Sequence, residues 1–269
     1  MEKETSKKRP RTKEVERILN CVPSLNPEKD WTITAALDSG LLTAPATPAS
    51  KDLRAPTWWA VGDQGSTGSC VGWGTADSVL RWHFVMASRL SKSEPLSVRY
   101  VWMAAKETDE FNTRPSCFIE QAGTSLKAAL DVARKFGVVT NLILPFSPPS
   151  MYTGNENTFW ALAAQRKISS YFNLGRNLAS WRSWIANSGP ILTRLDVDST
   201  WDNATQTKGN LQKYAGPGRG GHCVALVGYT PNYFIVRNSW GTSWGANGFA
   251  YAYDAYAQEA FTEAYGVAL

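Results

Sequence analysis

The chain has 269 residues, of which 43% are hydrophobic and 19% charged, a composition typical of a folded globular protein that excludes wholesale disorder. No apolar run approaches the roughly 20 residues of a membrane-spanning helix, so we expect no membrane association. The net charge is +5, most of it in the first seventeen residues, so we expect no nucleic-acid partner for the folded part.

The N-terminal region, residues 1–51, differs in character from the rest. It begins with a basic segment, continues with a short element expected at about 30–42, and ends in a Pro/Ala/Ser stretch at 44–50 that indicates a linker. We interpret Lys7–Lys13 as a mobile, solvated tail rather than an import or anion-binding patch. No apolar stretch that could serve as a secretory signal follows the basic start, so we expect a cytoplasmic protein.

Four cysteines occur, and none forms a Cys-x-x-Cys pair of the kind that binds a metal or carries redox chemistry. We therefore expect no disulfide framework, no metal and no cofactor. Cys21 and Cys117 are interpreted as small buried hydrophobic residues.

The first half of the compact part, starting near Asp52, is predicted to be helical. Apolar residues at helical spacing after a Gly/Ser-rich turn predict a buried helix that begins at about Cys70, with Ser69 as a plausible N-cap. Further helices are expected at Ser97–Lys106 and at Ser125–Phe136, the latter ended by Gly137.

The second half is richer in β-formers. After a short helix near Leu178–Ala186, strands are expected at Ile191–Val197, His222–Gly228 and Tyr233–Val236. The change from helices to strands predicts an α+β protein with two lobes, helical over about 52–145 and antiparallel β over about 146–269, with a cleft between them.

The spacing within the last predicted hairpin brings polar residues together. If residues 230–232 form a three-residue loop, His222 faces Trp240 and Asn238 faces Val224, so that His222, Asn238 and Trp240 share one face. An amide can reach an imidazole at that separation. The hairpin alone leaves two interpretations open, a general base oriented by an asparagine or a histidine that is merely hydrogen-bonded.

Cys70 is the candidate nucleophile, because unpaired N–H groups and the helix dipole at a helix start favour a thiolate. Gly65, Gly68, Gly72 and Gly74 flank it and would let backbone approach a ligand closely. Of the two histidines, His83 lies thirteen residues further along the same helix, about 20 Å away. His222 therefore remains as the partner of Cys70.

Three segments together resemble the papain-like cysteine peptidase family. Residues 63–70 (DQGSTGSC) are similar to its segment from glutamine to nucleophile, residues 221–229 (GHCVALVGY) to its histidine strand, and residues 238–245 (NSWGTSWG) to its asparagine segment. With Asp52-Leu53-Arg54 and Gly123-Thr124-Ser125-Leu126, the resemblance covers about residues 52–253. It implies a papain-like two-lobed fold, a peptidase domain over 52–269, and a possible short pro-like region in residues 1–51.

The resemblance also implies roles for individual residues. Cys70 would attack a peptide carbonyl, His222 would act as acid and base, Asn238 would orient the imidazole, and Gln64 would help to bind the oxyanion. For substrate binding, it implies that Gly123 and Thr124 pair with extended peptide backbone, that Cys223 lines a side-chain pocket, and that Trp240 shields the bond between His222 and Asn238.

The chain departs from the family pattern at three positions near these residues. Thr67 stands where the family usually has a disulfide-forming cysteine, and this absence fits a reducing compartment. Val71 replaces a tryptophan, and Thr124 replaces the second of two glycines. Residues 1–51 are also about half as long as the usual inhibitory propeptide, so autoinhibition is not assumed.

The function expected from the sequence is hydrolysis of peptide bonds in a peptide or protein substrate by a monomeric enzyme. Two alternatives stay open: a cysteine transferase or deamidase on the same scaffold, and an inactive peptide-binding homologue. The intact set of Gln64, Cys70, His222 and Asn238 argues against the inactive homologue.

Overall fold

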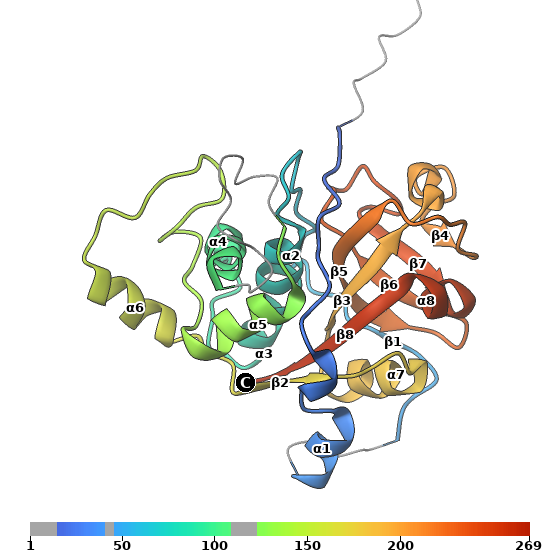
Figure 1. Ribbon diagram of the computed structural model, residues 1–269, viewed down its shortest axis with the longest axis horizontal. Helices are drawn as coiled ribbons and strands as arrows, with labels where there is room; N and C mark the ends of the chain where they lie inside the picture. The colour runs from blue at the N-terminus through green and yellow to red at the C-terminus, as the bar shows by residue number, and fades with distance from the viewer. Residues whose placement is uncertain (1–14, 41–45, 109–122) are drawn as a thin grey trace, which may run out of the picture.

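A buried helix at the junction of two lobes organises the molecule (Figure 1). The computed structural model describes residues 15–40, 46–108 and 123–269. The helix begins at Cys70, as predicted, and continues as α2 (Cys70–Gly72), the π-helical segment η2 (Trp73–Leu80) and α3 (Arg81–Met86). Ser69 occupies the N-cap position but makes no side-chain capping bond; its hydroxyl pairs with that of Thr67 at 2.6 Å.

The other long helices of the helical lobe are α4 (Val98–Thr108), α5 (Leu126–Lys135) and α6 (Glu156–Ala164). The first two match the predicted helices to within two residues. Ser125 caps α5 by accepting from the Ala128 N–H, and Gly137 follows its end at a φ of +92°, which favours glycine. α6 lies on the same side of the molecule as α4 (Figure 1), and its Phe159 contacts Tyr100 of α4 edge-to-face.

The other lobe is built on one twisted sheet with the strand order β2-β8-β3-β5-β6-β7-β4. All neighbouring pairs are antiparallel except β4 with β7, and β1 pairs with β5 off this path. The strands are β1 (Lys51–Asp52), β2 (Ser170–Asn173), β3 (Ile191–Val197), β4 (Asn210–Leu211), β5 (Gly220–Tyr229), β6 (Tyr233–Arg237), β7 (Phe249–Tyr253) and β8 (Phe261–Ala268). The remaining helices are η1 (Pro27–Lys29), α1 (Ile33–Asp38), α7 (Leu178–Asn187), η3 (Ser199–Asn203) and α8 (Asp254–Ala260).

The β5–β6 hairpin differs from the predicted register at its turn and agrees with it near its open end. Tyr229 pairs with Phe234 rather than with Tyr233, so the loop has one residue more than expected. A register shift between Leu226 and Gly228 compensates, and Ala225 pairs with Arg237 as the predicted register requires. The bulge therefore restores the alignment that brings the residues after β6 beside His222.

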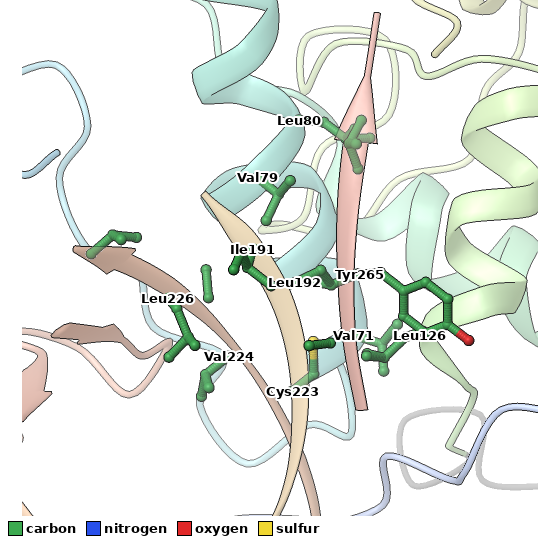
Figure 2. Close-up of a cluster of buried hydrophobic side chains, with 14 of the residues drawn as sticks. Val71, Val79, Leu80, Leu126, Ile191, Leu192, Cys223, Val224, Leu226 and Tyr265 are labelled. Atoms are coloured by element: carbon green, nitrogen blue, oxygen red, sulfur yellow. The ribbon is translucent and has the colours of Figure 1, made fainter. Parts of the chain in front are cut away.

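The central helix packs its apolar face onto the sheet, and this contact is the core between the two lobes (Figure 2). The buried residues of the cluster come from the helix (Val71, Val79, Leu80), from β3 (Ile191, Leu192), from β5 (Cys223, Val224, Leu226), from α5 (Leu126) and from β8 (Tyr265). Burial of such side chains contributes roughly 1.5–3 kcal/mol each. This core fixes the start of the helix against β5.

A buried ion pair also joins the helix to the sheet. Arg237 at the end of β6 is 1% exposed and lies 2.8 Å from the carboxylate of Asp77 in η2. The guanidinium also donates to the carbonyl of Ala60 at 2.6 Å. Because removal of one partner would leave an uncompensated buried charge, the pair constrains how the two lobes meet.

Residues 15–40 lie against the lobes, whereas the sequence led us to expect a tail, a short element and a linker. In Figure 1 the part of this segment that precedes α1 runs along the junction between the helices and the sheet, and α1 lies below the lobes. Asn20 forms an isolated parallel bridge with Gly221, and Thr32 forms another with Asn173 of β2. The short element expected near residues 30–42 is α1. Lys7–Lys13 and Cys117 lie outside the described residues.

Within the ranges that the structure describes, no helix is both long and apolar enough to cross a membrane.

Candidate active site

Cys70 lies in the first turn of the central helix, and its side chain is fully buried. Its N–H is one of the first N–H groups of the helix, which have no acceptor within the helix. The nearby glycines allow close packing here. A Cβ on Gly72 would strike the carbonyl oxygen of Val98 at the start of α4, and one on Gly74 would strike the sulfur of Cys223 in β5. The glycines therefore let both lobes approach the start of the helix.

β5 carries His222, and Asn238 directly follows β6. His222 Nε2 lies 2.8 Å from Asn238 Oδ1, and this oxygen also accepts the backbone N–H of Ser239 at 2.8 Å. Because a carbonyl oxygen only accepts, Nε2 carries the proton, and Nδ1 is left for another partner. Nδ1 is buried and has no hydrogen bond of regular geometry within the described part of the chain.

Indole rings enclose this histidine. The Trp240 ring lies 4.9 Å from the His222 ring at 35°, and Trp201 approaches the His222 ring edge-on at 5.6 Å. Trp244 stacks on Trp201 at 4.8 Å. The rings exclude water from the bond between His222 and Asn238, which strengthens that bond.

The neighbours of the Cys70 sulfur favour its thiolate form. A hydrogen bond from the Cys21 thiol, together with the adjacent His222, holds the pKa of the Cys70 thiol well below its ordinary value, although burial acts in the opposite direction. Burial and the nearby Cys70 charge raise the pKa of both Cys21 and Cys223. Of these three cysteines, Cys70 alone has a lowered pKa, which is the property expected of a nucleophile.

Gln64 is 1% exposed and fixed at both ends of its amide. Its Nε2 donates to the carbonyl oxygen of Thr67 at 2.9 Å, and its Oε1 accepts from the Ser239 hydroxyl at 2.8 Å. The Thr67 hydroxyl donates back to the Gln64 carbonyl at 2.7 Å. Threonine thus takes over a structural role where the family usually has a cysteine, and one amide hydrogen of Gln64 is left for a further acceptor.

A segment of the N-terminal region, residues 17–22, runs past these groups; we call it the cleft segment. Its Cys21 N–H donates to the carbonyl of Gly221 at 3.0 Å, and its Val22 N–H donates to the carbonyl of Thr124 at 3.2 Å. The Asn20 side-chain oxygen lies 4.0 Å from the Cys70 sulfur. The cleft segment therefore pairs with both lobes through its backbone.

Arg17 fastens the cleft segment across the junction. Its guanidinium donates to the carboxylate of Asp63 at 2.7 Å and to the carbonyl of Gly65 at 2.9 Å, both in the loop that carries Gln64. It also donates to the Trp240 carbonyl at 3.2 Å, with its Cζ 5.6 Å from the centre of that ring. One side chain thereby connects the glutamine loop with the loop that follows β6.

The residues expected to bind substrate lie in different settings. Gly123 and Thr124 border the cleft segment, and a Cβ on Gly123 would strike the carbonyl oxygen of Asn20. Trp240 lies over His222. The sulfur of Cys223 points at Gly74 within the core cluster of Figure 2, so a contribution of this residue to a side-chain pocket stays a prediction.

An open hollow of about 540 Å³ lies beside Trp240. Trp201, Trp244 and Arg219 line it from the β lobe, and Arg17 lines it from the cleft segment.

Several residues that shape this site were not predicted from the sequence. Arg17, Asn20 and Cys21 fall in the region interpreted as a tail, although an apolar run, Ile-Leu-Asn-Cys-Val-Pro at 18–23, follows the basic residues there and was the available signal. Arg194, whose Nε donates to the Cys21 carbonyl at 3.0 Å, and Trp201 carried no signal, because their role depends on long-range packing.

Comparison with known proteins identifies the family. Residues 47–265 match the papain family cysteine proteases. The chain belongs to this family. It is 25% identical over 201 residues to cysteine proteinase 1 of Dictyostelium discoideum, covering 71% of this chain and 56% of that protein. It is 28% identical over 205 residues to cathepsin J of Mus musculus, covering 70% and 55%. The chain thus spans about half the length of these curated relatives.

Solved structures share the fold. Xylellain, a cysteine protease from Xylella fastidiosa, superposes with a TM-score of 0.75 at 18% identity, covering 96% of this chain and 98% of that one. A cysteine protease of Carica candamarcensis in complex with E-64 superposes with a TM-score of 0.59 at 21% identity, covering 82% and 98%. The predicted papain-like α+β fold is confirmed.

Proposed function

We propose that this member of the papain family hydrolyses peptide bonds through a thioacyl intermediate on Cys70. The observation that carries the proposal is a buried sulfur at a helix start, its pKa depressed, beside a histidine whose Nε2 is bound to Asn238 at 2.8 Å. Binding alone requires no such arrangement of nucleophile, base and orienting amide.

In this mechanism the Cys70 thiolate attacks the carbonyl carbon, and the protonated His222 gives its Nδ1 proton to the leaving amine. The neutral imidazole then draws a proton from water, which attacks the thioester and releases the acid. Asn238 keeps the ring in one orientation through both steps, since its Oδ1 holds Nε2–H and is itself fixed by the Ser239 N–H.

The oxyanion of each tetrahedral intermediate would be bound by Gln64 Nε2 and the Cys70 backbone N–H. The remaining amide hydrogen of Gln64 supports this assignment, as does the position of the Cys70 N–H at the helix start, where it has no acceptor within the helix. One such donor lowers the barrier by roughly 3–4 kcal/mol in related acyl-transfer enzymes.

The substrate would lie as an extended peptide where the cleft segment now lies. Gly123 and Thr124 on one wall and Gly221 on the other would pair with its backbone. Thr124 and Gly221 pair in this way with the cleft segment, and Gly123 borders that segment. Because His222 protonates the leaving amine, the leaving part of the peptide would occupy the hollow beside Trp240. Cys223 remains a candidate for the wall of a side-chain pocket.

The cleft segment would inhibit the enzyme by occupying this site. It would escape cleavage because its backbone carbonyls are directed away from Cys70, that of Asn20 lying against Gly123. The Cys21 carbonyl is bound by Arg194, and the groups next to the nucleophile are the Cys21 thiol and the Asn20 side chain. Residues 1–51 would then act as a short pro-like region and 52–269 as the peptidase domain.

A reducing compartment such as the cytoplasm would suit the three buried cysteines that the structure describes, Cys21, Cys70 and Cys223, which are free thiols. The enzyme would act as a monomer on protein or peptide substrates.

The test is turnover of a denatured protein mixture, with product N-termini sequenced, together with labelling by a thiol-directed epoxide. The parent chain, once the cleft segment is displaced, should generate new N-termini and bind the epoxide at Cys70. The Cys70→Ala variant should do neither while keeping its fold by circular dichroism. Undiminished cleavage by Cys70→Ala would refute the assignment.

A further inference from the structure

A site that holds a guanidinium group lies where the loop carrying Gln64 meets the loop after β6. Arg17 fills it from the cleft segment. One guanidinium nitrogen donates to the Asp63 carboxylate at 2.7 Å and to the Gly65 carbonyl at 2.9 Å, and a second donates to the Trp240 carbonyl at 3.2 Å. The Arg17 Cζ also lies 5.6 Å from the centre of the Trp240 ring. We call these three oxygens and this ring the guanidinium site; none of them belongs to the cleft segment.

The guanidinium site keeps its shape without its occupant, because backbone contacts hold its two loops together. The Gln64 N–H donates to the Ser239 carbonyl at 2.8 Å. Next to this bond, Asp63 and Trp240 form an isolated antiparallel bridge. Both contacts join one loop directly to the other, so the acceptors stay in place when the cleft segment leaves.

The Asp63 carboxylate is positioned for a cation. Its Oδ1 accepts the Gly65 N–H at 2.9 Å, and its Oδ2 lies against Gly241, where a Cβ would approach to 2.9 Å. Gly241 has a φ of +75°, which favours glycine at this close approach. Within the ranges that the structure describes, Arg17 is the only ion-pair partner of Asp63. Departure of Arg17 therefore leaves a fixed, half-exposed carboxylate that can bind another cation.

The guanidinium site lies on the leaving side of the nucleophile. Trp240 borders the hollow assigned to the leaving part of a substrate, and Arg17 lines the same hollow. Asn20 comes three residues after Arg17, and its side-chain oxygen lies 4.0 Å from the Cys70 sulfur. Three residues span at most about 11 Å. A side chain on one of the first three residues of the leaving part can therefore reach the guanidinium site.

The chemistry of the guanidinium site selects a planar cation. Its oxygens, one carboxylate and two carbonyls, only accept hydrogen bonds, and the face of an indole ring attracts positive charge. Two nitrogens of one planar group meet the three acceptors, whereas a lysine side chain offers a single nitrogen. The site is therefore complementary to arginine in preference to lysine or a neutral side chain.

We propose that the guanidinium site binds an arginine side chain of the substrate, carried by one of the first three residues after the cleaved bond. This arginine takes the place of Arg17, so that substrate and cleft segment compete for the same acceptors. Asp63 is then a specificity-determining residue. The inference rests on the proposed function for the identity of the occupant as a substrate, whereas binding of a guanidinium requires no cleavage.

Binding without turnover is tested with N-ethylguanidinium and its neutral isostere N-ethylurea, which replace the side chain missing from the full Arg17→Ala chain. By ligand-detected NMR, N-ethylguanidinium should bind at least about five times more tightly than N-ethylurea, as expected of a partly exposed ion pair with a cation–π contact. The parent should show no such preference, because Arg17 fills its site. Asp63→Asn in the Arg17→Ala background should bring the ratio of affinities close to one.

Substrate preference is measured with peptide pairs that carry arginine or citrulline, its neutral isostere, at the first, second or third residue after a bond that the Arg17→Ala chain cleaves. At one of these positions kcat/KM should be at least about five times higher with arginine, and Asp63→Asn should bring this ratio close to one. Asp254→Asn is the matched control, because Asp254 pairs with Arg182 outside the lining of the hollow. It removes the same charge and should leave the ratio unchanged.

Equal affinities for the two small probes, or a preference that survives Asp63→Asn, would overturn the guanidinium site. Equal kcat/KM for arginine and citrulline at all three positions would overturn its role in substrate binding and leave the peptidase assignment intact. If the probes show the preference but no chain that retains Cys70 cleaves any peptide, the proposed function fails and the guanidinium site stands.

Discussion

At the scale of single residues, the state of the Cys70 sulfur depends on side chains distant in the sequence. The helix start places the sulfur where negative charge is favoured, and Cys21 and His222 stabilise the thiolate from the N-terminal segment and from β5. His222 in turn depends on Asn238 and on the indole rings around it. Substitution of any of these neighbours should therefore change the chemistry of Cys70.

The first prediction concerns the Cys21 thiol. Cys21→Ala removes a hydrogen-bond donor to the Cys70 thiolate, so the pKa of the Cys70 thiol should rise. The measurement is a titration of thiolate ultraviolet absorbance, corrected with Cys70→Ala, and the midpoint should move to higher pH. Cys21→Ser keeps a donor and should shift the midpoint less. A midpoint for Cys21→Ala at or below that of the parent would contradict the hydrogen bond.

At the scale of elements, local features of the central helix and of the β5–β6 hairpin allow the two to pack together at the site. Glycine is unfavourable within a helix, yet the glycines after Cys70 occupy positions where a Cβ would collide with α4 or with β5. The bulge in the hairpin has a comparable role, since it corrects the register before the chain reaches Asn238.

The second prediction follows from Gly74. Helix propensity alone favours Gly74→Ala by about 1 kcal/mol, whereas overpacking against the Cys223 sulfur should cost about 1–3 kcal/mol. The variant should therefore have a lower free energy of unfolding in urea. In a Cys223→Ala background the sulfur is absent, and the new Cβ would lie 3.7 Å from the Cβ at 223, so the cost should shrink. The same cost in both backgrounds would show that the collision is not with the sulfur.

The third prediction concerns His83 in α3, which is 7% exposed and whose Nε2 has no hydrogen-bond partner in the described residues. Burial lowers the pKa of His83 to about 4, although a hydrogen bond with the backbone of Pro190 opposes this. Between pH 6.5 and 4 the unfolded chain binds a proton that the folded chain does not. Stability should therefore fall as pH drops through this window, by about 3 kcal/mol from this group.

Urea unfolding at pH 7.5 and at pH 4 measures this effect. His83→Gln cannot titrate, so its loss of stability between the two pH values should be smaller than that of the parent by about that amount. An equal loss in both proteins would rule out His83 as its source.

At the scale of the whole molecule, the two lobes are held together both by their core and by the cleft segment. The core contact of Figure 2 and the buried pair of Arg237 with Asp77 fix the lobes relative to each other. The cleft segment adds contacts to both lobes, and Arg17 is its fastening point at one end. Displacement of the cleft segment leaves the core contacts in place, so opening of the site does not require unfolding.

The fourth prediction concerns that fastening point. Arg17→Ala removes an ion pair, two hydrogen bonds to carbonyls and a cation–π contact, all partly exposed. If this weakens docking by about 1 kcal/mol, epoxide labelling of Cys70 in the full chain should become roughly fivefold faster. High salt should accelerate labelling of the parent for the same reason.

Arg219→Ala is the matched control, because Arg219 lines the same hollow and pairs with an exposed aspartate, Asp202, outside the cleft segment. Labelling of this variant should proceed at the parent rate. Equal acceleration by both substitutions would show that general surface charge, rather than the Arg17 contacts, controls access to Cys70.

The sequence by itself determined the local elements and the identity of the candidate catalytic residues. Helical spacing located the central helix, period-two alternation placed His222, Asn238 and Trp240 on one face, and the distance along one helix eliminated His83. These features depend on neighbours in the chain or on a single hairpin, so periodicity suffices to find them.

Only the tertiary structure decided what surrounds those residues. The contact of Cys21 with Cys70, the binding of the cleft segment by Arg194 and Arg17, and the position of Trp201 behind His222 join segments with no shared periodicity. Such contacts form because burial of the whole chain brings distant side chains together, and no local pattern encodes which ones meet. The sequence therefore identified the candidate reactive groups, and the packing of the two lobes decided their environment.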